Sequence, residues 1–480
     1  MDLIQLNIIL LLILLVYSFF TKNRRFSKDD PKGPWALPLL GNLHLLGDNP
    51  HRSLTALMKY YGGFYRIWMG DHYTIVVSDP QLVREVWVKQ FDNFVNRPHP
   101  ASFEIYSGNF QDLAFSDEEL WRKSRALVSN SFTKTKMKII YGHLDNQIDQ
   151  LIATMKNHQG VQHPFYCRPY YSKFALNIIF KLLFSEQIEY EESVNEGKMA
   201  RLTGPIAVVF KKLGSGSVDD YVSLLYPFFY FSRRSFNAEV MKIKSFMREV
   251  YDDHVANLDP ENPKDLLDLM IIESDGNNID NILHVGMDFM LAGSDSTAGT
   301  IEWFCLFMIN NPEIQEKAYN ELVTVIGKGC RPDVKHRANT PYINAAIKEV
   351  MRMRPIGPLG IPRQAKQDCM VGGYFVPKGT QMIQNIYGLA NNDQYWKDPL
   401  VFQPERFLDN SHPDRCIAFG IGNRNCVGQN LAQDELYIAC TNILMNFRLK
   451  TVDGRSCDET EIFGLTIHPN PFPMHIEERV

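Results

Sequence analysis

Several common signatures are missing from this 480-residue sequence. It has no Cys-x-x-Cys pair and no His-Glu-x-x-His motif, which argues against a cysteine-rich zinc site and a zinc-protease site. Its eight cysteines are too few in a chain of this length to form a disulfide framework. It has no basic excess either: 50 Lys and Arg residues oppose 55 Asp and Glu residues, for a net charge of −5. Nucleic-acid-binding proteins usually carry a strongly basic balance, so we expect no nucleic-acid partner.

The remaining composition is that of an ordinary globular protein. Hydrophobic residues make up 45% of the chain, aromatic residues 12% and charged residues 22%, which excludes a disordered or low-complexity chain. At ~150 residues per domain the length suggests about three domains. However, the sequence has no internal repeat and no Gly- and Ser-rich linker. We therefore expect one large domain over residues 43–480, with enough residues to bury a sizeable core.

An apolar run from Leu3 to Phe20 is the most unusual segment. As a helix, its 18 residues would span about 27 Å at ~1.5 Å per residue, close to the ~30 Å hydrocarbon core of a bilayer. We predict a transmembrane anchor over residues 1–21. A cleaved signal peptide and a buried core helix are the alternatives. The run has neither the basic start and small-residue cleavage site of the former nor a polar face for the latter.

Basic residues follow the run at once, and only Asp2 and the terminal amine precede it. The basic residues are Lys22, Arg24, Arg25 and Lys28. The positive-inside rule then holds the C-terminal side in the cytosol. Residues 22–42 contain three prolines and two glycines between Pro31 and Asn42, so they favour neither a helix nor a central strand. We expect a basic, proline-rich hinge that acts as a semi-rigid spacer.

Helical spacing of apolar residues dominates the rest of the chain. It covers residues near 118–158, 235–258, 280–310, 312–327, 340–353 and 427–446. Short strand-like runs occur at Phe64–Met69, Thr74–Val77 and around Thr380–Asn385. This pattern predicts a mainly α fold with a minor β part. Between 98 and 115, and between 204 and 231, the pattern is poor. The aromatic run Tyr226–Phe231 in the second stretch is more typical of a core, and a membrane contact is the alternative.

The strongest chemical signal is the loop Phe419–Gly428, in which three glycines surround Cys426. Glycine lets the backbone approach a flat object closely. Cys426 stands at the start of a predicted helix, where backbone amides favour a thiolate. A nucleophilic cysteine would need a histidine base, and this loop contains none. Arg424 supplies a fixed cation for an anionic cofactor edge. Together these residues suit haem with a proximal sulfur ligand.

The loop resembles the F-G-x-G-x-R-x-C-x-G signature of the cytochrome P-450 family, the haem-thiolate monooxygenases. The resemblance implies the fold of that family and haem b (iron protoporphyrin IX) as the cofactor. It implies Cys426 as the axial thiolate, and therefore as the metal ligand, with Phe419 and Arg424 beside the haem. A structural cysteine in a glycine turn is the alternative. The resemblance extends over residues 31–480, with the main motifs of the family in order.

Two further segments resemble conserved structural motifs of this family. Glu349-Val350-Met351-Arg352 is an E-x-x-R, and Phe402–Phe407 is similar to the PERF segment. An E-x-x-R alone occurs by chance in a chain of this length and then means only a surface ion pair. The resemblance implies that Glu349, Arg352 and Arg406 form a buried charged triad with a structural role. One carboxylate shared by two guanidiniums is a set of partners that tolerates burial.

Several cations are implied as contacts of the haem propionates. Trp121 and Arg125 form a W-x-x-x-R pair, and the family carries propionate contacts at these positions. Arg363 resembles a second propionate arginine and Arg424 a third. Three cations for two carboxylates is a sensible number for a partly buried dianion. The alternative for Trp121 and Arg125 is an ordinary pair on one helix face.

The predicted helix 280–310 contains the weak helix formers Gly293, Ser294, Asp295, Ser296 and Thr297 in a row. This resembles the oxygen-groove motif of the family. The resemblance implies that Gly293 leaves room for O2 and that Asp295, with the hydroxyl of Ser296, relays protons to it. Ser296 stands where the family usually carries Thr, and serine lacks the methyl group that stiffens the side chain. Coupling of proton delivery to product is therefore in doubt. A simple helix kink is the alternative.

The anchor and hinge resemble those of the microsomal, eukaryotic type. This implies a single-pass protein of the endoplasmic reticulum membrane whose catalytic domain faces the cytosol. It also implies an NADPH-dependent flavoprotein reductase as partner, so that NADPH acts indirectly. The implied reaction inserts one oxygen atom of O2 into a small apolar substrate. We expect substrate contacts from Ala101–Phe115, Val285–Phe289, Leu359–Ile361 and Gly464–Ile467.

Two rival functions stay open at this point. One is an isomerase or dehydratase of the same fold that rearranges a peroxide substrate and uses neither O2 nor reductase. Such members generally have an altered acid–alcohol pair, whereas Asp295 and Ser296 are intact here. The other is a membrane-tethered haem protein that senses or carries gas without catalysis. That function would leave the residues of the oxygen groove unexplained.

Overall fold

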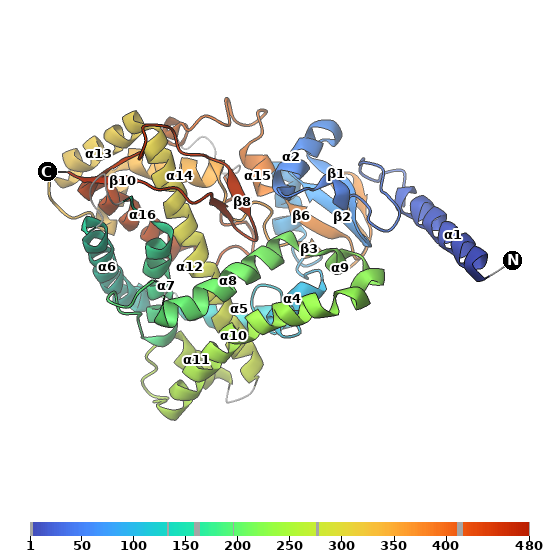
Figure 1. Ribbon diagram of the computed structural model, residues 1–480, viewed down its shortest axis with the longest axis horizontal. Helices are drawn as coiled ribbons and strands as arrows, with labels where there is room; N and C mark the ends of the chain where they lie inside the picture. The colour runs from blue at the N-terminus through green and yellow to red at the C-terminus, as the bar shows by residue number, and fades with distance from the viewer. Residues whose placement is uncertain are drawn as a thin grey trace.

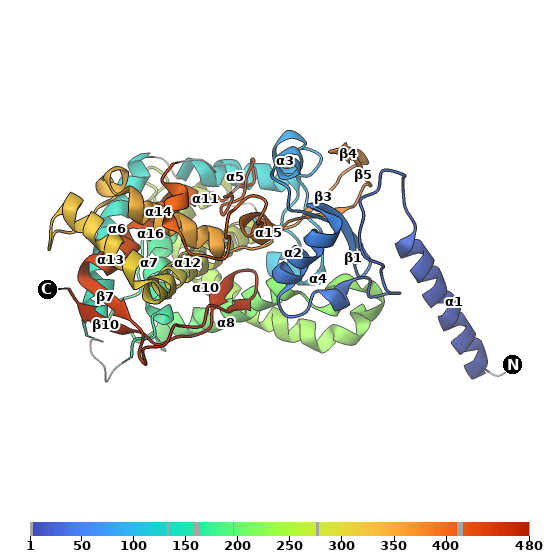
Figure 2. The ribbon, with the colours of Figure 1, turned by 90° about the horizontal axis from the view of Figure 1, so that it is seen from above.

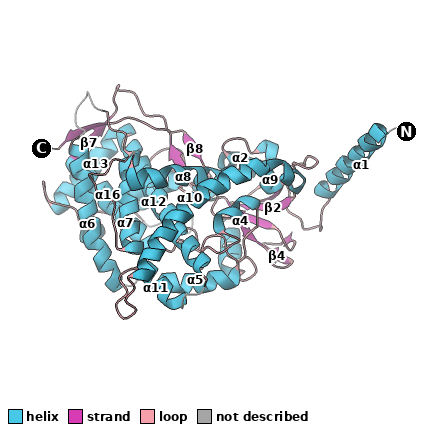
Figure 3. Ribbon diagram, turned by 60° about the horizontal axis from the view of Figure 1, so that its bottom comes forward, coloured by secondary structure: helices cyan, strands magenta, loops and turns pink. Residues whose placement is uncertain are grey.

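A computed structural model describes residues 3–131, 134–157, 164–194, 196–274, 278–409 and 416–479 of the chain. Helices make up most of the body; β2 and β4 lie toward the side from which α1 projects, whereas β7 lies at the opposite end, near the C-terminus (Figure 3). The helices are α1 (Leu3–Asn23), α2 (Pro50–Tyr61), α3 (Pro80–Arg84), α4 (Ala101–Ser107), α5 (Glu118–Ser131), α6 (Lys134–Lys156), α7 (Arg168–Phe184), α8 (Gly197–Ser215), α9 (Val218–Tyr221), α10 (Tyr230–Ala256), α11 (Leu266–Ser274), α12 (Ile279–Asn310), α13 (Pro312–Ile326), α14 (Pro341–Met353), α15 (Ile386–Ala390) and α16 (Gln429–Asn446). Short helical turns are η1 (Leu43–Leu45), η2 (Glu85–Lys89), η3 (Ser223–Phe229), η4 (Val334–Asn339) and η5 (Pro404–Phe407). The predicted mainly α fold with a minor β part is confirmed.

The predicted helices near the middle and end of the chain are confirmed as α10, α12, α13, α14 and α16. The segment 118–158, predicted as one helix, is two helices, α5 and α6, and residues 132, 133 and 158 lie outside the described part. The helix α12 runs through the centre of the body (Figure 1) and is buried over most of its length. A helix that is apolar nearly all round belongs in a core. It packs mainly against α7, α16 and α10.

The main sheet has the strand order β1-β2-β6-β3. Its strands are β1 (Phe64–Met69), β2 (His72–Val77), β6 (Gln381–Gln384) and β3 (Arg363–Gln364). β1 pairs antiparallel with β2, β2 pairs parallel with β6, and β3 pairs antiparallel with β6. Three two-stranded ribbons complete the β part: β4 (Cys369–Val371) with β5 (Tyr374–Val376), β7 (Phe447–Lys450) with β10 (His475–Glu478), and β8 (Glu461–Phe463) with β9 (Ile467–Pro469). The three predicted strands are β1, β2 and β6.

The helix α1 projects away from the body (Figures 1 and 2). Within the described residues it is the one helix long and apolar enough to cross a membrane, over Gln5–Asn23 with mean hydropathy 1.8. The hinge that follows lies against the sheet. The backbone N–H of Arg66 donates to the Lys32 carbonyl at 2.9 Å, and that of Asn42 donates to the Trp68 carbonyl at 2.6 Å. These two hydrogen bonds hold the hinge against strand β1.

Two stretches with poor patterns contain helices that the sequence did not reveal. α4 is only seven residues long, too short to show periodicity. α8 contains Pro205 in its interior, and proline normally marks a helix end. Its apolar face, with Leu202, Ile206 and Val209, is buried and holds the helix despite the lost backbone bond.

The aromatic run after α8 is not part of the core, so that interpretation of it is wrong. Leu224 is 64% exposed, Phe228 80% and Phe231 79%. These side chains lie on η3 and the first turn of α10. The N–H of Ser223 donates to Asp71 at 2.9 Å, and Lys22 at the end of α1 pairs with the same Asp71 at 3.5 Å. The exposed aromatic segment therefore lies close to the point where α1 leaves the body.

The implied charged triad is present and buried. Arg352 on α14 donates from Nε to Glu349 Oε2 at 2.7 Å and from Nη2 to Oε1 at 2.9 Å. Arg406 Nε on η5 donates to Oε1 of the same carboxylate at 3.2 Å. The side chains of Glu349 and Arg352 have no exposed surface. Arg352 also donates to the carbonyl oxygens of Ala390 and Pro399, so the triad joins α14 to the loops after α15 and before η5.

Candidate active site

A cavity of about 400 Å³ lies between α12, α5, the loop before α16 and the strands β3 and β6. Eight of the nine residues predicted from the sequence as site residues line this cavity: Trp121, Arg125, Gly293, Ser296, Arg363, Phe419, Arg424 and Cys426. The ninth, Asp295, lies behind the lining and touches other side chains. Segments far apart in the sequence thus meet around one cavity.

The loop before α16 holds Cys426 at the cavity wall. Gly420 and Gly422 have φ angles of +70° and +76°, which favour glycine. A Cβ on Gly422 would lie 2.1 Å from the Trp87 carbonyl oxygen, so no larger residue fits there. The N–H of Cys426 donates to the Phe419 carbonyl at 2.9 Å and closes the loop. All eight cysteines are in the described part of the chain, and only Cys426 lines this cavity.

The Cys426 side chain is enclosed by protein on most sides but open toward the cavity. Burial raises the pKa of its thiol above the ordinary value, although the Gly428 N–H and the charge of Arg125 oppose the rise. The expected effect of the backbone amide at the helix start is present, but burial outweighs it. A metal cation bound to the sulfur would deprotonate it.

Buried arginines crowd one side of the cavity. Burial, and then the charges of Arg97 and Arg363, lower the pKa of the Arg424 guanidinium to about 7. Burial also lowers the pKa of Arg363 well below its ordinary value. The Nε atoms of Arg363 and Arg424 are buried and have no hydrogen-bond partner in the structure. Cations that repel one another and keep unpaired Nε atoms fit an anionic group in the cavity, as the two propionates of haem would provide.

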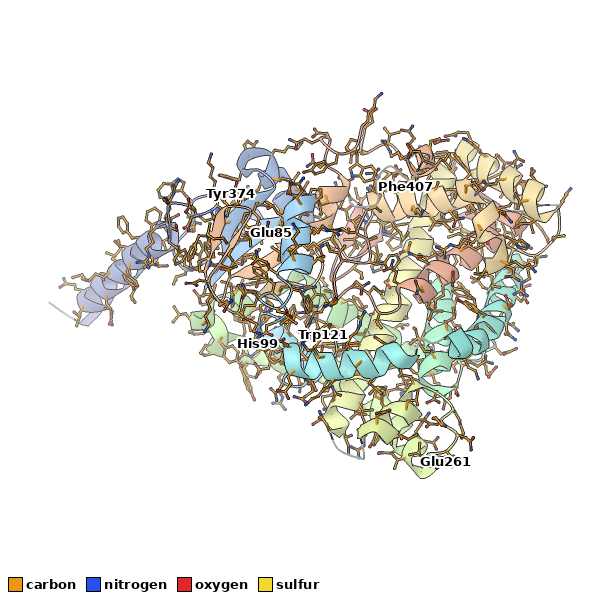
Figure 4. The ribbon with its side chains drawn as sticks, turned by 180° about the vertical axis from the view of Figure 1, so that it is seen from behind. Glu85, His99, Trp121, Glu261, Tyr374 and Phe407 are labelled. Atoms are coloured by element: carbon orange, nitrogen blue, oxygen red, sulfur yellow. The ribbon has the colours of Figure 1, made fainter. Side chains whose placement is uncertain are left out.

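Trp121 and Arg125 reach this cluster from successive turns of α5. Trp121 is buried on the inner side of the helix (Figure 4), and the Arg424 guanidinium lies 4.6 Å from its ring centroid. Arg125 donates to the backbone carbonyl of Asn425 at 2.8 Å and to its side-chain oxygen at 3.0 Å. The i, i+4 pair thus contacts Arg424 and Asn425, the two residues that precede Cys426 in the loop.

Arg97 is a member of this cluster that the sequence analysis missed. It lines the cavity and is 5% exposed. Its guanidinium donates to the carbonyl oxygens of Ala114 at 2.9 Å, Ile361 at 2.8 Å and Pro362 at 2.9 Å. Nothing in the local sequence Asn96-Arg97-Pro98 marks the residue, because its partners come from two segments distant in the chain.

The side chains of the expected oxygen-groove motif on α12 have other contacts than the resemblance implied. A Cβ on Gly293 would lie 2.4 Å from the Ile179 Cδ1 atom, so Gly293 makes room for a side chain of α7. Ser296 Oγ donates to the Ala292 carbonyl at 2.7 Å. Asp295 binds Arg168 at 2.6 Å and His468 at 2.9 Å. The acid and the alcohol therefore have separate partners in this structure.

A buried carboxyl group that the sequence analysis also missed follows on α16. Thr297 Oγ1 donates to Glu435 Oε2 at 3.0 Å, and both residues line the cavity. Burial raises the pKa of Glu435 to about 8, so its carboxyl group is largely neutral at pH 7. The sequence gave no sign that Glu435 is a site residue, because the spacing of apolar residues in a helix does not show whether an acidic side chain is buried or exposed.

Comparison with known proteins agrees with this geometry. A family model described as cytochrome P-450 matches residues 31–475. The chain belongs to the cytochrome P-450 family. Probable cytochrome P-450 519E1 of Dictyostelium discoideum is 42% identical over 506 residues and is covered to 99%, as is this chain. Probable cytochrome P-450 519B1 of the same organism is 42% identical over 514 residues, with 100% of both chains covered.

The fold of this P-450 has a solved counterpart. A zebra fish cytochrome P-450, in a structure with abiraterone, superposes with a TM-score of 0.79 at 26% sequence identity, and the match covers 90% of this chain and 100% of that one. Family membership over the full length makes this protein a haem-thiolate monooxygenase, an oxidoreductase whose haem iron is bound by a cysteine thiolate. The arginine cluster and the open face of Cys426 fit that cofactor.

Proposed function

We propose that this P-450 binds haem b through the Cys426 thiolate and inserts one oxygen atom of O2 into a small apolar substrate. Electrons come from NADPH through a flavoprotein reductase. One observation supports this most directly: Cys426 is the cysteine that lines a cavity whose wall carries two buried arginines, Arg363 and Arg424, with unpaired Nε atoms. When bound, haem supplies the activation of oxygen, and the protein supplies binding, orientation and exclusion of water.

Each residue around the cavity would have its own part in holding the cofactor. Cys426 would bind the iron through its sulfur, and Phe419 lies in the same loop against the cavity. The propionates would be held by a set of side chains that meet on one wall: Arg97, Trp121, Arg125, Arg363 and Arg424. A guanidinium fork matches a carboxylate in geometry, so the two carboxylates would offset the repulsion among the arginines.

The four stretches expected to touch substrate all contribute to the cavity wall. They supply residues such as Phe115, Phe289, Ile361 and Leu465. Other large apolar side chains, including Ile179 of α7, join them. These apolar side chains favour a small apolar substrate. We assign oxygen binding and proton delivery to Gly293, Asp295 and Ser296 on α12, of which Gly293 and Ser296 line the cavity and Asp295 lies behind its wall.

The test of this function is reductase-driven oxygen consumption. Purified protein, loaded with haem and mixed with an NADPH-dependent reductase, should consume O2 only when NADPH is present. Either of two other results would contradict the proposal and favour another function. Turnover of an organic hydroperoxide without reductase would indicate a peroxide-rearranging enzyme. Reversible gas binding, with neither activity, would indicate a sensor.

We also propose that the protein is a single-pass protein of the endoplasmic reticulum membrane with its body in the cytosol. The length of α1 and the basic residues after it support this placement. The exposed segment of η3 and early α10 supports a second membrane contact beside α1. Its members are Leu224, Tyr226, Phe228, Tyr230 and Phe231. Aromatic side chains of this kind favour the interface of a bilayer.

A chain that begins at Thr21 should still bind phosphatidylcholine vesicles through this segment. Replacing both Phe228 and Phe231 by Asp should lower that binding by more than about tenfold, since each buried Phe contributes ~1.5–3 kcal/mol. Vesicle flotation measures the bound fraction. The control is Val255→Asp at the far end of α10, where an exposed apolar residue is also replaced. Equal loss in both variants would show that the segment is not the contact.

A further inference from the structure

The carboxylate of Asp295 lies in a cluster that joins three distant segments. Arg168 begins α7, Asp295 is on α12, and His468 is on β9 near the C-terminus. Asp295 Oδ1 accepts from Arg168 at 2.6 Å, and Oδ2 accepts from the Thr466 hydroxyl at 2.5 Å. His468 Nε2 lies 2.9 Å from both Asp295 Oδ2 and Thr466 Oγ1. No motif in the sequence pointed to Thr466 or His468.

The charge state of Asp295 follows from these partners. Burial alone would raise the pKa of its carboxyl group, but the charges and bonds of His468, Arg168 and Thr466 outweigh burial and hold the pKa well below the ordinary value. Asp295 therefore stays ionised near neutral pH. A carboxylate that stays ionised stores no proton, so a neighbour has to supply any proton that passes through it.

His468 is held in an orientation suited to that role. Arg168 N–H groups contact both ring nitrogens, Nδ1 and, at 3.2 Å, Nε2. Because Nε2 also lies 2.9 Å from Asp295 Oδ2, which can only accept, we assign the ring hydrogen to Nε2 and the acceptor role to Nδ1. The ring lies directly over Gly299 of α12, where a Cβ would be 2.5 Å from Nδ1. A glycine inside a helix costs about 1 kcal/mol relative to alanine. Here the glycine leaves the space that the imidazole occupies.

Thr466 is the member of the cluster that reaches the cavity. It lines the cavity wall, as Ser296 does, whereas Asp295 and His468 lie behind the wall. Ser296 directs its hydroxyl to the Ala292 carbonyl, and Asp295 is bonded to Thr466 instead. The hydroxyl that connects the buried carboxylate with the cavity is therefore that of Thr466. Arg168 is about one third exposed, so the outer end of the cluster meets solvent.

We propose that His468 and Thr466 complete the proton pathway of this P-450, with Thr466 as the hydroxyl that passes protons into the cavity and His468 as the positioning residue that supplies them. In one passage Nδ1 of His468 first takes a proton from solvent, after the Arg168 N–H has moved away from it, and the imidazolium so formed lies beside the Asp295 carboxylate. Nε2 then gives its proton to the Thr466 oxygen as the Thr466 hydroxyl proton moves into the cavity. His468 is left neutral with its hydrogen on Nδ1, and it returns to the starting tautomer when Nε2 gains a proton and Nδ1 releases one to solvent. Asp295 stays ionised and stabilises the imidazolium. The inference rests on the proposed function, because it deepens the proton delivery assigned to Asp295.

Charged groups of α7 and α12 face His468. Arg168 of α7 contributes a cation, and Asp295 and Glu302 of α12 contribute acidic groups. Arg168 binds Glu302 at 2.9 Å as well as Asp295. Burial raises the pKa of Glu302 and the Arg168 charge opposes that rise.

The first test is Thr466→Val in the full-length, haem-loaded protein with reductase and NADPH in air-saturated buffer. Oxygen consumption should fall by at least about tenfold, since a positioned proton donor contributes ~10²–10⁴ in rate. The matched control is Thr460→Val. That threonine is exposed and also donates to an aspartate, Asp458, at 2.6 Å, but it is outside the cluster. Consumption by Thr460→Val should equal that of the unchanged protein.

The second test is the pH profile of His468→Gln. Glutamine keeps a hydrogen-bonding group at this place but cannot accept and release a proton, so the variant should be slow, and its oxygen consumption should depend on pH in a different way from that of the unchanged protein. Gly299→Ala, which displaces the ring, should act in the same direction. A residue with only a structural role would lower the rate equally at every pH.

A third measurement needs no turnover. The shifts in Tm of Asp295→Asn and His468→Gln should not add in the double variant, because the two side chains bind each other. Additive shifts would overturn the inference whatever the reductase assay gives. Normal oxygen consumption by Thr466→Val would also overturn it. If the unchanged protein binds haem yet consumes no oxygen with reductase, the proposed function fails instead, and the Tm measurement still decides whether the His468 contact exists.

Discussion

Replacing Cys426 by histidine should abolish the strongly red-shifted Soret band of the reduced, carbon-monoxide-bound protein. The imidazole variant should show the band position typical of a nitrogen-bound haem, or bind no haem. Monooxygenase turnover should fall by more than about 10³, because only the thiolate pushes electron density toward the iron and favours cleavage of the O–O bond. The optical spectrum and the reductase assay measure the two effects on the same sample.

The matched control for this variant is Cys330→Ser. Cys330 is the other exposed cysteine among the eight, and it does not line the cavity. Its replacement should leave both the spectrum and the turnover unchanged. A red-shifted band that survives in Cys426→His would show that another residue binds the iron, and the proposed ligand would then be wrong.

The second large effect concerns the stability of the fold. Arg352→Met should lower the free energy of unfolding by about 3–5 kcal/mol, the usual cost of removing one partner from a buried ion pair. Methionine matches much of the volume of arginine, so the loss comes from charge and hydrogen bonds. Glu349 would remain fully buried with Arg406 as its one cationic partner, and the carbonyl oxygens of Ala390 and Pro399 would lose their donor. Denaturant unfolding of the purified protein measures the change.

The control for this prediction is an exposed ion pair of similar geometry. Lys123 binds Glu119 at 3.0 Å on α5, and their side chains are 71% and 87% exposed. Exposed pairs of this kind contribute little, so Lys123→Met should leave the unfolding midpoint within experimental scatter. If the two variants unfold at the same denaturant concentration, the triad is not the stabilising feature that its burial implies.

The sequence by itself determined the parts of this protein that depend on neighbouring residues. The glycines and Arg424 around Cys426 lie within one loop, and the apolar spacing of α12, α14 and α16 lies within each helix. Local spacing of this kind sets backbone geometry and the direction of side chains, so it can be recognised without a fold. The same holds for the prediction of an anchor, which uses the length and flanking charges of one continuous segment.

The tertiary structure alone decided which distant residues share a site. Arg97 joins the arginine cluster and Glu435 joins Thr297 only because the chain folds back on itself. Exposure of the aromatic segment at Phe228 was likewise undecided, since an apolar run suits a core and a membrane contact equally well.

The partners of Asp295 were likewise decided only by the tertiary structure. Arg168 and His468 stand on opposite sides of it in the sequence, and both bind its carboxylate only in the folded chain. Side-chain spacing along one helix does not tell which elements will pack against that helix. The charge state of a buried acid depends on those elements, and therefore so does its chemistry.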